Sequence, residues 1–145
     1  MNPSDDELRK ILIDAKTIAM VGASDNPEKP SHRIFKQLLD AGYRVIPVNP
    51  RETAVLGVPA VASLSAIHEP VDIVDVFRRA EETPPIADEA AALGAKTLWL
   101  QKGISNDDTA ARAHAKGLVV VMDKCIGATH HALGIPTRSS AATAG

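Results

Sequence analysis

The sequence predicts an α/β fold: a doubly wound, mostly parallel sheet with helices on both faces, forming three α/β/α layers. Strand-like and helix-like segments alternate along the 145 residues, which is typical of right-handed βαβ units. The strand-like segments are runs of branched aliphatic residues, and aromatic residues make up only 3% of the chain. Such runs are typical of parallel strands that are buried on both faces. A chain of this length is expected to form one domain with its own core.

The N-terminal part of the chain is expected to form a helix, a strand and a second helix. Ser4 and Glu7 have the spacing of a capping box, which predicts that the first helix begins here. The apolar run at residues 17–21 predicts the first strand. A helix is then expected over residues 31–41, because the apolar side chains fall on one face and Gly42 follows where helices commonly end.

The remaining segments continue the same alternation. Four strands and two helices are expected, in the order 44–48 (strand), 72–77 (strand), 84–93 (helix), 96–100 (strand), 106–116 (helix) and 118–122 (strand). Residues 52–70 read as an irregular connection with a short strand near 60–61 and a helical turn around 64–67. Thr83 and Ser105 belong to the residue types that cap helix N-termini, so each is expected to cap the helix that follows it.

Residues 1–135 are expected to form the single domain, and residues 136–145 a mobile tail, because the tail contains few apolar side chains. The one cysteine, Cys125, excludes an internal disulfide and is typical of a cytoplasmic protein. The acidic N-terminus is unlike a signal peptide, and no apolar run approaches the roughly 20 residues that cross a membrane. A net charge of −2 without a basic run argues against nucleic acid as a partner.

The loops that follow the strands are the expected ligand site, because doubly wound sheets bind ligands beyond the carboxyl ends of their strands. The first of these loops starts at Gly22 and leads into a helix N-terminus, an arrangement that favours a phosphate group. It lacks the second glycine of the dinucleotide fingerprint, since Ser24 stands there. A turn without a ligand and an NAD(P)-binding oxidoreductase remain alternatives at this point.

The end of the second strand also departs from the dinucleotide pattern. An acidic residue that would bind a ribose 2′-hydroxyl is replaced by Asn49, Pro50 and Arg51. An arginine near this position better suits a phosphorylated ribose. These departures weaken the NAD(P) interpretation, and the sequence shows no tyrosine–lysine pair for hydride transfer.

At this point the residues carry a resemblance to a known family. The stretch VGASDNPEKPSHRIFKQLLDAGYRVIPVNP, followed by VFRR, LWLQKGI and VVVMDKCIGATHH, resembles the small stand-alone CoA-binding protein family. That family is similar to the N-terminal CoA-binding domain of succinyl-CoA synthetase α subunits and of NDP-forming acyl-CoA synthetases. The resemblance covers residues 8–135 and implies a Rossmann-like, nucleotide-binding domain that holds coenzyme A.

The resemblance also implies which residues contact coenzyme A. Those expected at its phosphates are Gly22, Ala23, Ser24, Ser31, His32, Arg33 and Lys36. Those expected at the adenine and ribose are Val48, Asn49, Pro50, Phe77 and Arg78, with Arg51 at the 3′-phosphate. Gln101, Lys102 and Gly103 are expected toward the pantetheine, and Cys125 is given a place in the site.

The charges of the chain support this interpretation. Coenzyme A carries about four negative charges at neutral pH, which a group of cations can balance. The basic residues expected around one rim are Arg33, Lys36, Arg51, Arg78, Arg79 and Lys102. Each of them alone could be an ordinary solvated side chain, so the prediction depends on their convergence.

Cys125 and His130 suggest a further possibility at the end of the last strand. A Cys–His pair can make a thiolate nucleophile, which would allow a minor acyl-CoA or thiol activity. A lone cysteine is more often a small buried apolar residue. Metal binding by His130 and His131 is not expected, because no second pair of ligands stands at zinc spacing.

The sequence therefore favours a non-catalytic CoA-binding protein whose ligand is coenzyme A or an acyl-CoA. In the related synthetases a phosphorylated histidine lies in a second domain that this sequence does not contain, so the resemblance does not imply ligase activity for this chain alone. A homo-oligomer or a separate catalytic partner protein would be compatible with such a role. No membrane or nucleic-acid partner is expected.

Overall fold

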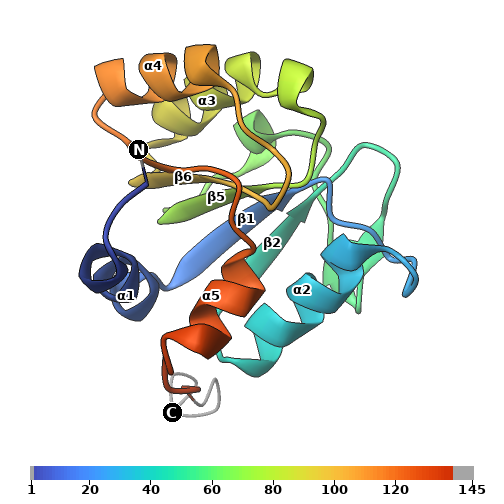
Figure 1. The fold of residues 1–145 in the computed structure, drawn as a ribbon. Coiled ribbons are helices and arrows are strands. Elements are labelled where there is room, and N and C mark those ends of the chain that lie inside the picture. The colour runs from blue at the N-terminus through green and yellow to red at the C-terminus, as the bar shows by residue number, and fades with distance from the viewer. Residues whose placement is uncertain (1, 139–145) are drawn as a thin grey trace.

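The computed structural model describes residues 2–138 and shows one parallel sheet between two layers of helices (Figure 1). The strands are β1 (Thr17–Val21), β2 (Arg44–Val48), β5 (Ile73–Val76), β6 (Thr97–Leu100) and β7 (Val119–Val121). Their order in the sheet is β2-β1-β5-β6-β7, and every neighbouring pair is parallel. The predicted Rossmann-like α/β fold with three layers is confirmed.

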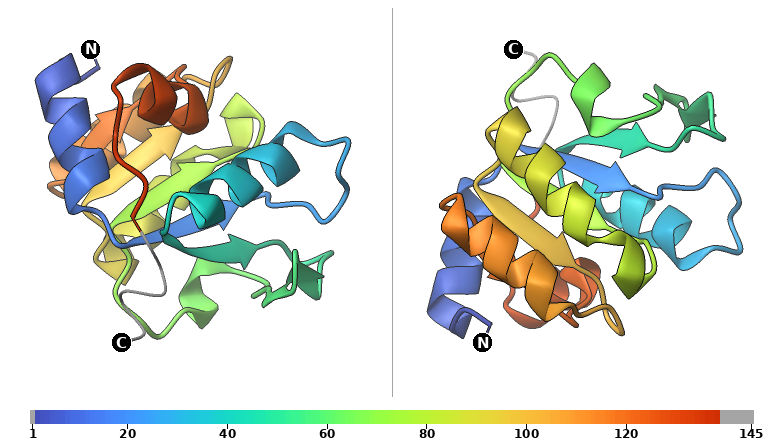
Figure 2. Two further views of the ribbon diagram at one scale, coloured as in Figure 1. Left: turned by 90° about the horizontal axis from the view of Figure 1, so that it is seen from below. Right: turned by 90° about the horizontal axis from the view of Figure 1, so that it is seen from above.

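Helices cover both faces of this sheet. They are α1 (Asp5–Asp14), α2 (Pro30–Asp40), α3 (Pro84–Leu93), α4 (Asp107–Ala115) and α5 (Ile126–Ala132). Figure 2 shows α3 and α4 on one face and α1, α2 and α5 on the other. Helix α5 was not predicted: it has only seven residues and contains Gly127, so its sequence gives a weak helical signal.

Each face of the sheet has its own hydrophobic core. Against α3 and α4 the core is aliphatic and includes Val74 and Leu98. On the other face the fully buried Phe35 and Trp99 pack with α1, α2 and α5. The indole Nε1 of Trp99 donates a hydrogen bond to the carbonyl oxygen of Lys124 at 2.9 Å, which satisfies its polar atom.

The connection after β2 is more regular than expected. It contains an unexpected antiparallel hairpin of β3 (Ala54–Val55) and β4 (Val58–Pro59), and then the 3₁₀ turn η1 (Leu64–Ala66) where a helical turn was expected. A second 3₁₀ turn, η2 (Ala80–Glu82), follows β5. The short strand expected near 60–61 is a single bridge between Val61 and Val48. Figure 2 shows this hairpin and the loop before α2 extending at the same end of the molecule.

The capping residues of two helices differ from those expected. Asn106, not Ser105, caps α4, and its side chain accepts a hydrogen bond from the Thr109 amide at 3.0 Å. Thr83 precedes α3 but makes no side-chain cap; its hydroxyl instead donates to the carbonyl oxygen of Ala80 at 2.7 Å. The capping box of Ser4 and Glu7 is present as predicted.

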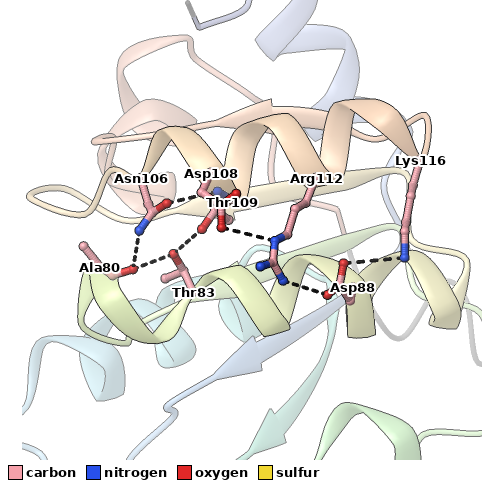
Figure 3. A network of polar contacts seen from close by, with 8 residues as sticks. All are labelled: Ala80, Thr83, Asp88, Asn106, Asp108, Thr109, Arg112 and Lys116. Carbon is pink, nitrogen blue, oxygen red and sulfur yellow. Dashed lines mark hydrogen bonds and ion pairs between the residues drawn. The ribbon is translucent and has the colours of Figure 1, made fainter.

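Polar side chains join α3 and α4 in a continuous network (Figure 3). The hydroxyl oxygens of Thr83 and Thr109 lie 2.6 Å apart, and Nδ2 of Asn106 donates to the Ala80 carbonyl at 3.0 Å. Both threonines are fully buried. These bonds satisfy the polar atoms that the helix contact removes from water.

Ion pairs extend the same network toward the far end of the two helices (Figure 3). Arg112 pairs with Asp88 at 3.0 Å and with Asp108 at 3.2 Å, and Lys116 lies 3.5 Å from Asp88. The side chains of these residues are all partly exposed, so each pair is expected to contribute little to stability.

The predicted domain boundary at residue 135 falls before residues that pack on the domain. Arg138 donates hydrogen bonds to the carbonyl oxygens of Leu12 (3.2 Å), Ile13 (2.8 Å) and Ala15 (2.6 Å), at the end of α1. Its guanidinium also lies 4.6 Å from the centre of the Tyr43 ring. The described part of the predicted tail is therefore anchored, and residues 139–145 lie outside the described residues.

Candidate functional site

The carboxyl ends of the five strands meet along one edge of the sheet. Strand β1 lies at the point where the chain order reverses, because β2 is on one side of it and β5 on the other. This is the position where doubly wound sheets bind ligands. We refer to the segments that follow the strands, residues 22–29, 49–53, 77–79, 101–105 and 122–125, as the carboxyl rim.

The ends of β1, β2 and β5 come into contact at Gly22. The Gly22 amide donates to the carbonyl oxygen of Val48 at 2.9 Å, and its φ of +86° lies in the left-handed region. A Cβ atom placed on Gly22 would lie 2.2 Å from the carbonyl oxygen of Phe77. Glycine is therefore required here both by the backbone conformation and by the lack of space.

The loop after Gly22 is held by its own polar groups. Nδ1 of the buried His32 lies 3.0 Å from the carbonyl oxygen of Ser24, and Oγ of Ser24 accepts a hydrogen bond from the Asn26 amide at 3.1 Å. Ser31 is also buried, at the start of α2. No side chain caps this helix, whose N-cap is Lys29, so the first turn of α2 remains suited to a bound anion.

Four of the six basic side chains expected around the rim form no ion pair within residues 2–138. These are Arg33, Arg51, Arg78 and Lys102. All but Arg78 are exposed.

The other two expected cations have acidic partners. Lys36 pairs with Asp40 at 2.7 Å, and Arg79 lies 3.6 Å from Glu81 and 3.8 Å from Glu82. The predicted cluster is therefore divided into four unpaired and two paired cations.

Two hollows divide the predicted residues further. A hollow of about 250 Å³ lies at the ends of β1, β2 and β5; its lining includes Val48, Pro50 and Arg78, together with apolar side chains of Leu64 and Ile86. A larger groove of about 850 Å³ runs between α2 and α5. Its lining includes Arg33, Lys36, His32, Gln37, His130 and His131.

Two carboxamides of the rim face inward. Nδ2 of Asn49 donates to the carbonyl oxygen of Ala23 at 2.8 Å, so this side chain joins two loops. Gln101 is buried; its Nε2 donates to Oδ1 of Asp75, and its Oε1 accepts from the Ile126 amide at 3.3 Å. The next two residues in the chain, Lys102 and Gly103, are exposed. The Gly103 amide donates a hydrogen bond to Oδ1 of Asp123 at 2.6 Å.

Asp75 is a buried acid that the sequence analysis did not identify. It lies within β5 and is fully buried, and its Oδ2 has no hydrogen-bond partner. Burial raises the pKa of this carboxyl group to about 8, although the hydrogen bond from Gln101 lowers it in part. The carboxyl group is therefore largely protonated at neutral pH. In the sequence, the only indication of this buried acid is a single aspartate inside the otherwise apolar strand 73–76.

Cys125 lies at the N-terminus of α5, where its Sγ accepts a hydrogen bond from the Ala128 amide at 3.4 Å. It lines a hollow of about 650 Å³ together with Lys102 and Lys124. No hydrogen bond joins it to His130, which is buried and meets the Tyr43 ring edge-on at a centroid distance of 5.9 Å. Burial and the nearby Arg138 lower the pKa of His130. The hypothesis of an activated Cys–His pair is therefore not supported.

The described residues contain neither a candidate metal site nor a helix that could span a membrane. Among residues 2–138, no group of three or more His, Cys, Asp or Glu side chains is placed to hold a metal ion. No helix in this part of the chain is long and apolar enough to span a membrane.

Comparison with known proteins gives matches along most of the chain. Residues 16–131 match a protein family described as CoA binding domain. The uncharacterized protein YneT of Bacillus subtilis is 46% identical over 129 residues, which are 89% of this chain and 96% of that protein. The solved structure of cell-free ID.343 from Thermus thermophilus is 41% identical, with a TM-score of 0.86, over 90% of this chain and 99% of that one.

A shorter match connects the chain to a much larger protein. The alpha subunit of ADP-forming acetate–CoA ligase II from Pyrococcus furiosus is 44% identical over 57 residues. These residues are 39% of this chain but only 12% of the ligase subunit. The likeness therefore concerns one part of that subunit.

Proposed function

Because this chain belongs to the CoA-binding domain family, we propose that it binds coenzyme A or an acyl-CoA across the carboxyl rim, as a stand-alone domain. The observation that carries the proposal is the family match, which spans residues 16–131 and therefore includes every segment of the rim. The four unpaired cations support it, since they supply the positive charge that a phosphorylated ligand requires. The proposal includes a cytoplasmic location.

The geometry supports an assignment of the parts of coenzyme A. The phosphates would lie at the turn Gly22–Ser24 and the uncapped start of α2, where amide groups and the helix dipole favour negative charge. The adenine would occupy the hollow lined by Val48, Pro50 and Arg78, because a flat ring fits a small apolar pocket beside a guanidinium group.

The remaining parts of the ligand have candidate contacts on either side. Arg51 would bind the 3′-phosphate, and the pantetheine would extend past Lys102 and Gly103 toward Cys125. For Gln101 and Asn49, any side-chain contact would add to hydrogen bonds that these groups already make inside the protein. Phe77, next to Gly22, would border the nucleotide.

We assign no reaction to this site. The match to the ligase covers 12% of that subunit, so its activity is not extended to this chain. The proposal is compatible with a homo-oligomer and with a separate catalytic partner protein. An NAD(P)-binding oxidoreductase remains the rival interpretation, and no contact in the structure favours it.

A ligand titration tests the proposal. The purified protein is titrated by calorimetry with CoA, acetyl-CoA, dephospho-CoA, NAD and NADP, and its melting temperature is followed in parallel. CoA or acetyl-CoA is expected to bind and to raise the melting temperature, because a ligand that binds only the folded state stabilises it. Binding of NAD or NADP without binding of CoA would overturn the proposal.

The substitution Arg51→Ala tests the assignment of the 3′-phosphate. Affinity for CoA is expected to fall by about tenfold to a hundredfold, the usual effect of losing a hydrogen bond between charged groups. Affinity for dephospho-CoA should hardly change, because that molecule lacks the phosphate. Arg112→Ala, on the α3–α4 face, is the matched control and should affect neither ligand. Equal losses for the two ligands in Arg51→Ala would reject this role.

A further inference from the structure

Asn49 links the two loops that would hold different phosphates of coenzyme A. Its Nδ2 donates to the carbonyl oxygen of Ala23 at 2.8 Å, and its Oδ1 accepts from the Arg51 amide at 2.9 Å. These bonds fix the orientation of the carboxamide, because its NH₂ group must face a carbonyl and its oxygen must face an amide. Both polar atoms already have partners inside the protein.

We propose that Asn49 is a positioning residue that holds Arg51 at a fixed distance from the turn at Gly22. It would thereby set the preference of the site for ligands that carry a phosphate at each of these two places. The inference rests on the proposed function, since it concerns the same ligand. It changes the role of Asn49 from a ligand contact to a brace between ligand contacts.

Other bonds hold the main chain on both sides of Arg51. The Glu52 amide donates to the Asn49 carbonyl at 3.2 Å and closes a turn around Arg51. The carboxylate of Glu52 accepts from the Asp25 amide at 2.7 Å. The segment that carries Arg51 is therefore tied to the loop after β1 at a second point, beyond the Asn49 bridge.

The hairpin after Glu52 is tied to the same loop. Oδ1 of Asp25 accepts a hydrogen bond from the Leu56 amide at 2.9 Å. Leu56 has a φ of +47°, which is unfavourable for a residue with a side chain. A conformation of this kind persists where the surroundings fix it, and the bond from Leu56 to Asp25 is one such restraint. The two loops therefore form one braced unit around Arg51.

A braced Arg51 should favour binding for an entropic reason. A phosphate-binding arginine on a loose loop must lose main-chain freedom when the ligand arrives, and this loss reduces affinity. With its main chain held by Asn49, Arg51 loses only side-chain freedom. The benefit applies to CoA and not to dephospho-CoA, because only CoA carries the 3′-phosphate that Arg51 would bind.

The test compares the affinities of the two ligands in Asn49→Ala by calorimetry. Affinity for CoA is expected to fall by about threefold to tenfold, as for the loss of one or two hydrogen bonds. Affinity for dephospho-CoA should fall less, so that the ratio of the two affinities moves toward one. In the background of Arg51→Ala, Asn49→Ala should no longer change this ratio, since the group it positions is absent.

Asn106→Ala is a matched control for a purely structural effect. Asn106 has the same bonding pattern, donating to the Ala80 carbonyl and accepting from the Thr109 amide, but it lies between α3 and α4. This variant should lower the melting temperature and leave the ratio of affinities unchanged. Asn49→Ser keeps an oxygen that can accept from the Arg51 amide. In this variant the ratio of the affinities for CoA and dephospho-CoA should therefore lie between those of the wild type and Asn49→Ala.

Two outcomes would overturn the inference. One is an equal loss of affinity for CoA and dephospho-CoA in Asn49→Ala, or in Asn49→Ser if the alanine variant does not fold. The other is a change of the ratio by Asn49→Ala that persists in full in the Arg51→Ala background. Failure of the wild-type protein to bind either ligand would instead contradict the proposed function, so the two failures are distinguishable.

Discussion

The α3–α4 contact and the carboxyl rim use their polar side chains in different ways. Between α3 and α4, hydroxyls, a carboxamide and charged groups bond to one another (Figure 3). At the carboxyl rim, Arg51, Arg78 and Lys102 form no ion pair within residues 2–138, and neither does Arg33 near the start of α2. Polar groups that satisfy each other hold two helices together, whereas the four cations have no acidic partner among the described residues. They do not share one hollow: Arg33 lines the groove between α2 and α5, Arg78 the hollow at β1, β2 and β5, and Lys102 the hollow beside Cys125.

The two faces of the sheet also differ in their buried polar atoms. Among the described residues, the buried side-chain atoms without a hydrogen-bond partner are Oδ2 of Asp75 and Nε2 of His130. Asp75 is in register with Met20 and Trp99, which belong to the core on the α1–α2–α5 face, and His130 is part of α5. This face therefore tolerates unsatisfied groups, while the α3–α4 contact does not.

The largest difference between the carboxyl rim and the α3–α4 region is expected from two glycines. Gly22 and Gly94 both have φ near +85°, but a Cβ atom at Gly94, after α3, would meet nothing within 4 Å. Gly22→Ala should lower the free energy of unfolding by about 2 to 5 kcal/mol, because strain and a backbone clash add. Gly94→Ala should cost only about 1 kcal/mol, for the conformation alone. Equal losses in urea unfolding would contradict this contrast.

The buried carboxyl group of Asp75 should give stability a particular pH dependence. The pKa of this carboxyl group is about 8 in the folded protein, whereas an ordinary aspartate has a value of 3.8. Between these two pH values the folded protein keeps a proton on Asp75 that the unfolded chain has lost. Stability should therefore fall as the pH rises from 4 to 8, by up to about 1.4 kcal/mol per pH unit from this group.

Asp75→Asn should remove this part of the slope, since the amide does not titrate and its oxygen can still accept from Gln101. Urea unfolding of both proteins between pH 5 and 8 measures the difference. An unchanged slope in the variant would show that Asp75 is not the group responsible.

A smaller effect is expected for the buried hydroxyl pair between α3 and α4. Thr109→Val removes the bond to Thr83 and keeps the side-chain shape. The free energy of unfolding should decrease by about 1 kcal/mol, the net contribution of one hydrogen bond. The affinity for CoA, measured by calorimetry, should stay the same, because this pair lies outside the carboxyl rim. A weaker affinity would mean that the α3–α4 contact and the rim are energetically coupled.

The smallest effect is expected for the ion pairs at the surface of this network. Arg112→Ala removes the contacts with Asp88 and Asp108, which are solvent-exposed. The loss in stability should stay below about 1 kcal/mol and should shrink further at high salt. Thermal unfolding at two salt concentrations measures it, and a salt-independent loss would point to packing of the arginine stem instead.

The main elements of the fold were predictable because their signals are local and strong. Residues 18–21 and 45–48 are uninterrupted apolar runs, each preceded by one polar residue, and the structure forms strands over 17–21 and 44–48. The hairpin at 54–59 was missed because its turn places Leu56 in a conformation that usually marks glycine or asparagine. The cap of α4 differed by one residue, since Ser105 and Asn106 are both good capping residues.

The position of the rim was predictable, whereas the directions of its side chains were not. Strand order in a parallel sheet brings the loops together, so Gly22, Asn49 and Phe77 could be placed at one edge from the sequence. Whether a carboxamide faces a ligand or a neighbouring loop depends on tertiary contacts, as Asn49 and Gln101 show. The pairing of Lys36 with Asp40 follows helical spacing and could have been anticipated.

The contacts of Arg138 have a consequence for the order of events during synthesis. The C-terminal carbonyls of α1 receive hydrogen bonds from a side chain that follows Leu12 by 126 residues. A ribosome makes about 5 to 20 residues per second, so about 6 to 25 seconds pass between the synthesis of this helix end and that of Arg138. Until then α1 is held by its capping box, by the burial of Leu8 and Leu12 and by the hydrogen bond from the Tyr43 hydroxyl to the Leu12 carbonyl. The carbonyls of Ile13 and Ala15 should therefore gain their side-chain partner only after nearly all of the domain has been made.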